Sequence, residues 1–132
     1  MEVIVSQEEG RVPVTVFQVK GNIAASTYEQ LEQQAQEAYD AGTRYLLLDL
    51  AGVNFLSSAG IRAIHKIYEL LRSDSPAESD EAVREGIREG TYKSSHLKLL
   101  KPKSQVLETL QMAGLDMYLE IHTDRTKAID SF

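Results

Sequence analysis

Hydrophobic residues recur at every second position in two short runs near the start of the chain. Val3 and Val5 stand two positions apart, and Glu8–Gly10 then forms a turn. The second run has valines at positions 12, 14, 16 and 19, with Phe17 among them. A period of two is typical of β-strands, so the pattern predicts an N-terminal hairpin. Pro13 has no N–H and suits the first residue of a strand or an edge position.

Helical spacing follows in four places. Ser26 or Thr27 is a suitable cap for a helix that runs to about Ala41, with Gly42 as the residue after its end. The residues after Ser57 and Ser58 carry an apolar side, and Arg62, Lys66 and Glu69 lie on the opposite side. A third helix is expected after Pro102, ending at Gly114, and a short fourth helix is capped by Thr123. The apolar side of the second helix consists of Ile61, Ile64, Ile67, Tyr68 and Leu71.

Three further strands are expected between these helices. Tyr45–Leu50 is a nearly continuous apolar run, which is typical of a central strand covered on both faces. His96–Leu100 and Met117–Ile121 are shorter strands. Because strands and helices alternate after the hairpin, we expect an α/β fold. The expected fold has a mixed, mostly parallel sheet with an N-terminal hairpin, and about four helices.

Residues 73–95 differ from the rest of the chain in composition. Six acidic and three basic residues give this segment a net charge of −3, half of the chain total of −6. Few large apolar residues occur, so little surface is available for burial. We expect an exposed, mobile insertion with one marginal helical turn near Asp80–Glu85. A short helix over Ser79–Glu89 is the alternative, weakened by Gly86.

Composition narrows the class of protein. A chain of 132 residues with 42% apolar residues suits one domain with one core. The net charge of −6 disfavours direct nucleic-acid binding, which needs a basic surface. The chain has no cysteine, no basic and apolar leader, and no apolar run near the roughly 20 residues of a membrane span. We therefore expect a cytoplasmic protein without a membrane association.

The most informative chemistry lies at Ser57 and Ser58, where an apolar strand gives way to a helix. A helix N-terminus offers unpaired N–H groups and the positive end of the helix dipole, both of which favour a phosphate. Spacing alone favours a simple N-cap, since serine is a preferred cap. The two interpretations are compatible, with Ser57 as the cap and Ser58 as a phosphate acceptor.

Other polar residues do not form a recognisable catalytic or metal-binding pattern. Asp49 ends a strand, but no second carboxylate or histidine accompanies it at useful spacing, which favours a structural role. The three histidines at 65, 96 and 122 are far apart in the sequence. No glycine-rich phosphate-binding loop and no nucleophile–base pair can be named. We therefore expect no metal, no cofactor and no enzymatic activity.

Three local motifs resemble the STAS domain family, the sulfate transporter and anti-sigma factor antagonist domain. Gly21-Asn22-Ile23 is similar to the family's glycine, variable and apolar residues before the first helix. Leu48–Arg62 resembles the antagonist signature of an apolar strand followed by the phosphoacceptor turn. Val106–Leu115 is similar to the family's third helix, which ends in a small residue, glycine and leucine. Apart from residues 73–95, the resemblance covers almost the whole chain and implies one STAS domain over residues 1–132.

The resemblance assigns roles within the turn. Ser58 takes the phosphoacceptor position, Ala59 the small residue and Gly60 the glycine. Ser57 and Ala24 stand where antagonists often carry aspartate, so this site is less acidic. Without a side chain, Gly60 is expected to leave room for a partner or a phosphate.

The resemblance also implies a function, that of an anti-sigma factor antagonist. The unphosphorylated protein would bind an anti-sigma factor with serine kinase activity, and phosphorylation of Ser58 would break that complex until a serine phosphatase reset it. The alternative is a STAS module that binds a small ligand or acts as a scaffold, with Ser58 only a helix cap. The expected partner-binding residues are Gly21, Asn22, Ala24, Ser26, Ser57, Ser58, Ala59, Gly60 and Arg62.

Overall fold

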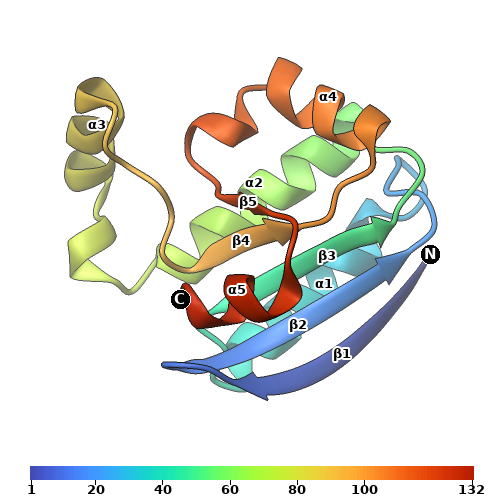
Figure 1. Cartoon of the computed structure of the whole chain (residues 1–132), viewed down its shortest axis with the longest axis horizontal. Coiled ribbons are helices and arrows are strands. Elements are labelled where there is room, and N and C mark those ends of the chain that lie inside the picture. The colour runs from blue at the N-terminus through green and yellow to red at the C-terminus, as the bar shows by residue number, and fades with distance from the viewer.

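A five-stranded sheet runs through the molecule in the order β1-β2-β3-β4-β5 (Figure 1). The computed structural model describes residues 1–132. β1 (Glu2–Glu9) and β2 (Pro13–Lys20) form an antiparallel hairpin. Pro13 is the first residue of β2. Three further strands follow, each parallel to the one before it: β3 (Leu46–Gly52), β4 (Leu97–Leu100) and β5 (Ile121–His122). The predicted α/β fold, with its mostly parallel sheet and N-terminal hairpin, is confirmed.

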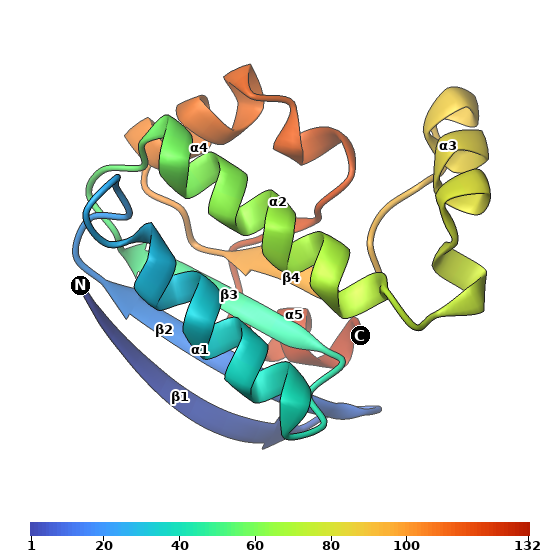
Figure 2. The same cartoon turned by 180° about the vertical axis from the view of Figure 1, so that it is seen from behind.

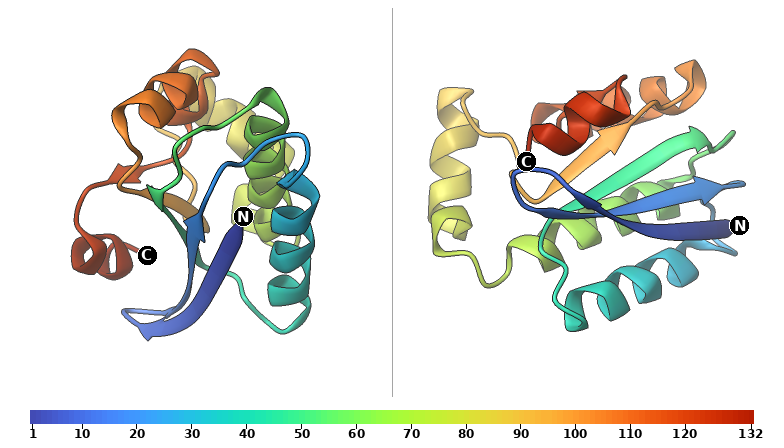
Figure 3. Two further views of the ribbon diagram at one scale, coloured as in Figure 1. Left: turned by 90° about the vertical axis from the view of Figure 1, so that its right-hand side faces the viewer. Right: turned by 60° about the horizontal axis from the view of Figure 1, so that its bottom comes forward.

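The helices cover the two faces of the sheet unequally. α1 (Tyr28–Asp40) and α2 (Ser58–Arg72) lie side by side on one face, as Figure 2 shows. α4 (Ser104–Met112) packs into the same core, whereas the short α5 (Arg125–Asp130) covers the opposite face (Figure 3). The main core therefore lies between the sheet and α1, α2 and α4.

Alternation along β3 explains its continuous apolar run. Leu46, Leu48 and Leu50 point into the main core, whereas Leu47 joins the smaller core under α5. All of these leucines are fully buried. A central strand covered on both faces carries apolar side chains on both of them, as the sequence indicated.

The expected strand at Met117–Ile121 is wrong in its bounds. A 3₁₀ turn, η2 (Leu115–Met117), follows α4, and β5 contains only Ile121 and His122. The N–H of Leu119 donates to the carbonyl of Leu115, and the Leu119 side chain is buried in the main core. Helical hydrogen bonding thus continues where the apolar pattern suggested a strand.

In the 73–95 segment, the alternative of a short helix over Ser79–Glu89 is confirmed, and the expected single marginal turn near Asp80–Glu85 is wrong. The segment contains a 3₁₀ turn, η1 (Pro76–Glu78), and a ten-residue helix, α3 (Asp80–Glu89), which projects at one end of the molecule (Figure 1). Ser79 caps α3 by accepting a hydrogen bond from the N–H of Ala82 at 3.2 Å. A Cβ at Gly86 would lie 2.7 Å from the Cβ of Tyr92, so glycine permits the close packing that compensates for its low helix propensity.

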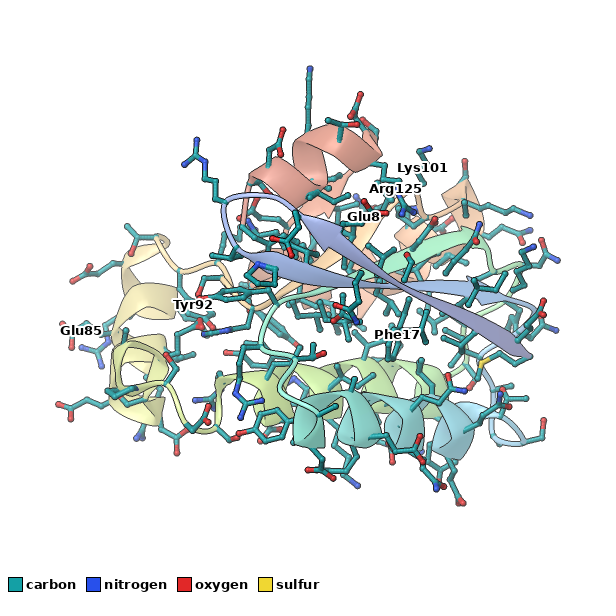
Figure 4. All side chains as sticks on the ribbon, turned by 90° about the horizontal axis from the view of Figure 1, so that it is seen from below. Glu8, Phe17, Glu85, Tyr92, Lys101 and Arg125 are labelled. Carbon is teal, nitrogen blue, oxygen red and sulfur yellow. The ribbon has the colours of Figure 1, made fainter.

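A buried polar network attaches this segment to the body of the molecule. The Glu78 carboxylate, only 6% exposed, accepts hydrogen bonds from the Tyr92 hydroxyl at 2.7 Å and the Ser95 hydroxyl at 3.1 Å. His96 Nε2 lies 3.3 Å from the same carboxylate. The Tyr92 and Tyr68 hydroxyls are 2.8 Å apart, which links the network to α2. Figure 4 shows Tyr92 between α3 and the sheet.

Candidate functional site

The two serines at the start of α2 have different environments. Ser57 is the N-cap, and its Oγ accepts a hydrogen bond from the N–H of Gly60 at 3.2 Å. Ser58 is the first residue of the helix, and its side chain is exposed. Ser57 therefore caps the helix, as expected from the sequence, while the hydroxyl of Ser58 is exposed.

Two loops from different parts of the chain meet at this turn. The N–H of Ile23 donates to the carbonyl of Phe55 at 3.0 Å, and the N–H of Ser57 donates to the carbonyl of Ile23 at 2.9 Å. These bonds form a parallel bridge between Ile23 and Leu56. They bring the Gly21–Ser26 loop against the Ser57–Gly60 turn, so the expected partner-binding residues from both loops lie together.

Gly60 is required for this contact between the loops. A Cβ at this position would lie 2.6 Å from Leu56 Cδ1 and 2.7 Å from the carbonyl oxygen of Ile23. The idea that Gly60 leaves room for a partner or a phosphate is therefore wrong, because Ile23 and Leu56 occupy that space. Ala59 and Gly60 are both buried, so they position the turn without presenting side chains to a partner.

Thr27 holds the first loop in shape. Its hydroxyl donates to the carbonyl of Asn22 at 2.9 Å and accepts from the N–H of Ala24 at 3.0 Å. Gly21 adopts a φ of 103°, which favours glycine, and its N–H donates to the carbonyl of Gly52 at 3.0 Å. Asn22 and Ser26 are exposed on this loop, whereas Ala24 is half-buried. These bonds fix the loop's position beside Ser58.

Phe55 is a surface feature that the sequence reasoning missed. It is 55% exposed, although Val53 and Leu56 on either side of it are buried. Phe55 precedes the two serines and lies in the backbone bridge between the loops. In the sequence, Phe55 and Leu56 form an apolar pair before the turn, and only the structure shows that the Phe55 side chain faces solvent. An exposed aromatic ring is a typical anchor for a protein partner.

Arg62 lies one helical turn after Ser58 and is exposed. It takes part in none of the ion pairs of the structure, whereas Lys66 on the next turn pairs with Glu32 at 3.6 Å. Both cations border a groove of about 940 Å³ between α1 and α2, here called the α1–α2 groove. Its lining consists of Tyr28, Glu29, Glu32, Gln33, Gln36, Arg62, Lys66, Ile67, Glu69 and Leu70.

The remaining polar candidates have structural partners away from this turn. The Asp49 carboxylate is buried and accepts from the N–H of Ala51 at 3.0 Å. His65 bonds to Tyr118, His96 lies against Glu78, and His122 lies 3.0 Å from Glu120. The structure contains no group of three metal-ligating side chains and no helix that is long and apolar enough to cross a membrane.

The backbone at the start of α2 contributes a partial positive charge to the turn. Ser57 Oγ is hydrogen-bonded to a backbone N–H, and neither serine hydroxyl is bonded to a histidine or carboxylate that would activate it as a nucleophile. The positive end of the α2 dipole lies at Ser58, and it favours a negative group there. The turn therefore presents an exposed hydroxyl at a position where the helix favours a negative group.

Comparison with known proteins identifies the family. Residues 4–75, more than half of the chain, match the STAS domain family, and the chain belongs to that family. No curated protein sequence matches the chain.

Several solved structures share the fold. An anti-sigma factor antagonist from Mycobacterium paratuberculosis is 20% identical over 96% of this chain and 89% of that chain, with a TM-score of 0.69. The anti-sigma factor antagonist SpoIIAA in its unphosphorylated form is 14% identical over 96% of this chain and 94% of its own, with a TM-score of 0.67. The phosphorylated form of the Bacillus cell fate determinant SpoIIAA is 17% identical over 96% of this chain and 97% of its own, with a TM-score of 0.59. At these identities the similarity establishes the fold.

Proposed function

We propose that this STAS protein is an anti-sigma factor antagonist controlled by phosphorylation of Ser58. The observation that carries the proposal is the exposed Ser58 hydroxyl at the first position of α2, beside a separate cap, Ser57. The fold shared with anti-sigma factor antagonists, one of which has a phosphorylated form, supports it. The proposal treats residues 1–132 as a single STAS domain that performs no catalysis itself.

The chemical step belongs to the partner, an anti-sigma factor with serine kinase activity. The Ser58 oxygen attacks the γ-phosphorus of ATP, and a new O–P bond forms as the bond to the β–γ bridging oxygen breaks. ADP leaves, and the hydroxyl proton passes to a base on the kinase. A serine phosphatase reverses the modification by hydrolysis. The phosphoserine adds about −1.5 to −2 charges at the turn.

The added charge explains why the complex would dissociate. The binding surface comprises the exposed part of the Gly21–Ser26 loop, Phe55, Ser58 and Arg62, which surround the turn. Burying a phosphoserine in an interface without a matching cation is costly, and partner carboxylates would repel it. The unphosphorylated protein therefore binds the anti-sigma factor and frees the sigma factor, and in this way it regulates transcription indirectly.

A phosphorylation assay tests the assignment. Incubation with the cognate anti-sigma kinase and ATP should add one phosphate, located at Ser58 by mass spectrometry. Ser58→Ala should abolish the modification, whereas Ser57→Ala should retain it. Modification of Ser57 alone would contradict the proposal.

A second candidate function is a STAS module that binds a small ligand. The α1–α2 groove of about 940 Å³ is the observation that favours it. The two functions are distinguished by Ser58→Asp, which should weaken binding to the anti-sigma factor more than tenfold, or about 1.4 kcal/mol, if the turn is the switch. Aspartate carries less charge than phosphoserine, so the phosphorylated protein is the stronger test. Unchanged binding by both proteins would favour the ligand-binding module.

A further inference from the structure

We infer that Arg62 binds the phosphoryl group of phosphorylated Ser58 within the same molecule and thereby transmits the modification to the α1–α2 groove. The inference rests on the proposed phosphorylation of Ser58. It assigns a regulatory role to a cation that no carboxylate of the protein engages.

The position of Arg62 on α2 provides the contact. Residues 58 and 62 are one turn apart on the same helix, where side chains have Cβ atoms about 5–6 Å apart. Helical side chains tilt toward the N-terminus, so the Arg62 side chain leans toward residue 58. Both side chains are exposed, and no other element separates them. A guanidinium forms two parallel hydrogen bonds to a phosphate, which makes arginine well suited to this pairing.

The other cations near the turn are less available. Lys66 lies a further turn along α2 and pairs with Glu32 of α1 at 3.6 Å. The Lys103 ammonium group is hydrogen-bonded to the side-chain oxygen of Asn54. Arg62 has no such partner, so a phosphate on Ser58 can bind the guanidinium without first breaking an ion pair. This difference selects Arg62 among the neighbouring cations.

Movement of Arg62 toward the phosphate changes the charge of the groove. Arg62 and Lys66 are the two cations in its lining, which also contains Glu29 and Glu32 of α1 and Glu69 of α2. When the Arg62 charge pairs with the phosphate, Lys66 is the remaining cation of the groove beside the two α1 carboxylates. The α1 side of the groove therefore senses a covalent change on α2.

The inference is tested on protein with phosphoserine placed at position 58 during translation, so that no kinase is needed. The phosphate is titrated by ³¹P NMR in the wild-type background and in Arg62→Gln, with Lys66→Gln as the matched control on the next turn. Pairing with Arg62 favours the dianion, so we expect the wild-type titration midpoint about 0.2–0.4 pH unit below that of Arg62→Gln at low salt. Lys66→Gln should titrate like the wild type. Identical midpoints for all three proteins would overturn the inference.

A second readout on the same proteins follows the groove. Backbone amide resonances of Glu29, Glu32 and Gln33 should shift on phosphorylation in the wild type and in Lys66→Gln. The shifts should be lost in Arg62→Gln. Shifts that persist without Arg62 would show that the groove is reached by another route and would contradict the inference. If the pairing is present but no kinase modifies Ser58, the proposed function fails while this contact stands.

Discussion

Gly60 has the least tolerance for substitution of any residue at the turn. Gly60→Ala would place a Cβ 2.7 Å from the carbonyl oxygen of Ile23, a backbone atom that cannot move without displacing the loop. We expect the free energy of unfolding to fall by about 1–3 kcal/mol, as for overpacking of a core. Urea denaturation measures the change. A Gly60→Ala protein as stable as the wild type would show that the two loops are loosely joined.

The serines at 57 and 58 make a matched pair of substitutions. Ser57→Ala removes the hydrogen bond to the N–H of Gly60 and should lower the free energy of unfolding by about 0.5–2 kcal/mol. Ser58→Ala removes an exposed hydroxyl and should change the free energy of unfolding by less than about 0.5 kcal/mol. Thermal unfolding measures both effects. Equal losses of stability would mean that the capping and acceptor roles are not divided as the geometry indicates.

At the scale of elements, the segment from η1 through α3 depends on Glu78. Glu78→Ala would leave the Tyr92 and Ser95 hydroxyls and His96 without their shared acceptor, at a cost of about 1–3 kcal/mol. Hydrogen exchange should therefore increase in α3 and in residues 91–95 while α1 stays protected. Glu81→Ala is the control, because Glu81 is an exposed carboxylate on the same segment. If exchange also increased in Glu81→Ala, the effect would come from the loss of a negative charge and not from the network.

The same network decides the expected result of deleting residues 73–95. A flexible loop would be replaceable by a short Gly/Ser turn at little cost. Because Glu78 and Tyr92 contact His96 and Tyr68, such a deletion removes the buried partners of groups in the body. We expect a fold that persists with a lower melting temperature. A shortened protein that melts like the wild type would show that the network adds nothing to global stability.

At the scale of the whole molecule, three tyrosines join α2, the 73–95 segment and the connection before β5. Burial raises the pKa of Tyr118 to about 12, and burial is also the main cause that raises the pKa values of Tyr68 and Tyr92. The folded state therefore favours the neutral phenols, whereas the unfolded chain releases these protons near pH 10. The stabilisation is fully present below pH 10 and is lost as the pH rises toward 12.

We accordingly expect the free energy of unfolding to decrease steeply above pH 10. Denaturation followed at pH 8, 10 and 11 measures the slope, and absorbance at 295 nm reports the phenolates. Tyr118→Phe should reduce the slope, since that residue no longer titrates. Tyr28→Phe, a tyrosine of α1 outside the cluster, is the matched control and should leave the slope unchanged. A flat stability profile from pH 8 to 11 would contradict the shared burial of the three rings.

Local patterns in the sequence determined the hairpin, the central strand, the helices on its main face and the Ser57–Ser58 turn. These features could be predicted because strand and helix periods, glycine ends and serine caps are encoded within a few neighbouring residues. The family motifs added the role of Ser58 and the loop that accompanies it.

Only the tertiary structure decided features whose causes lie far apart in the chain. Gly60 is required because Ile23, from another loop, lies against it. Phe55 is exposed because the bridge to Ile23 orients the backbone at this point. The composition of residues 73–95 indicated a mobile loop, but their stabilising partners, Tyr68 and His96, lie outside the segment. Burial and hydrogen bonding are properties of contacts across the fold, and a window of sequence does not contain them.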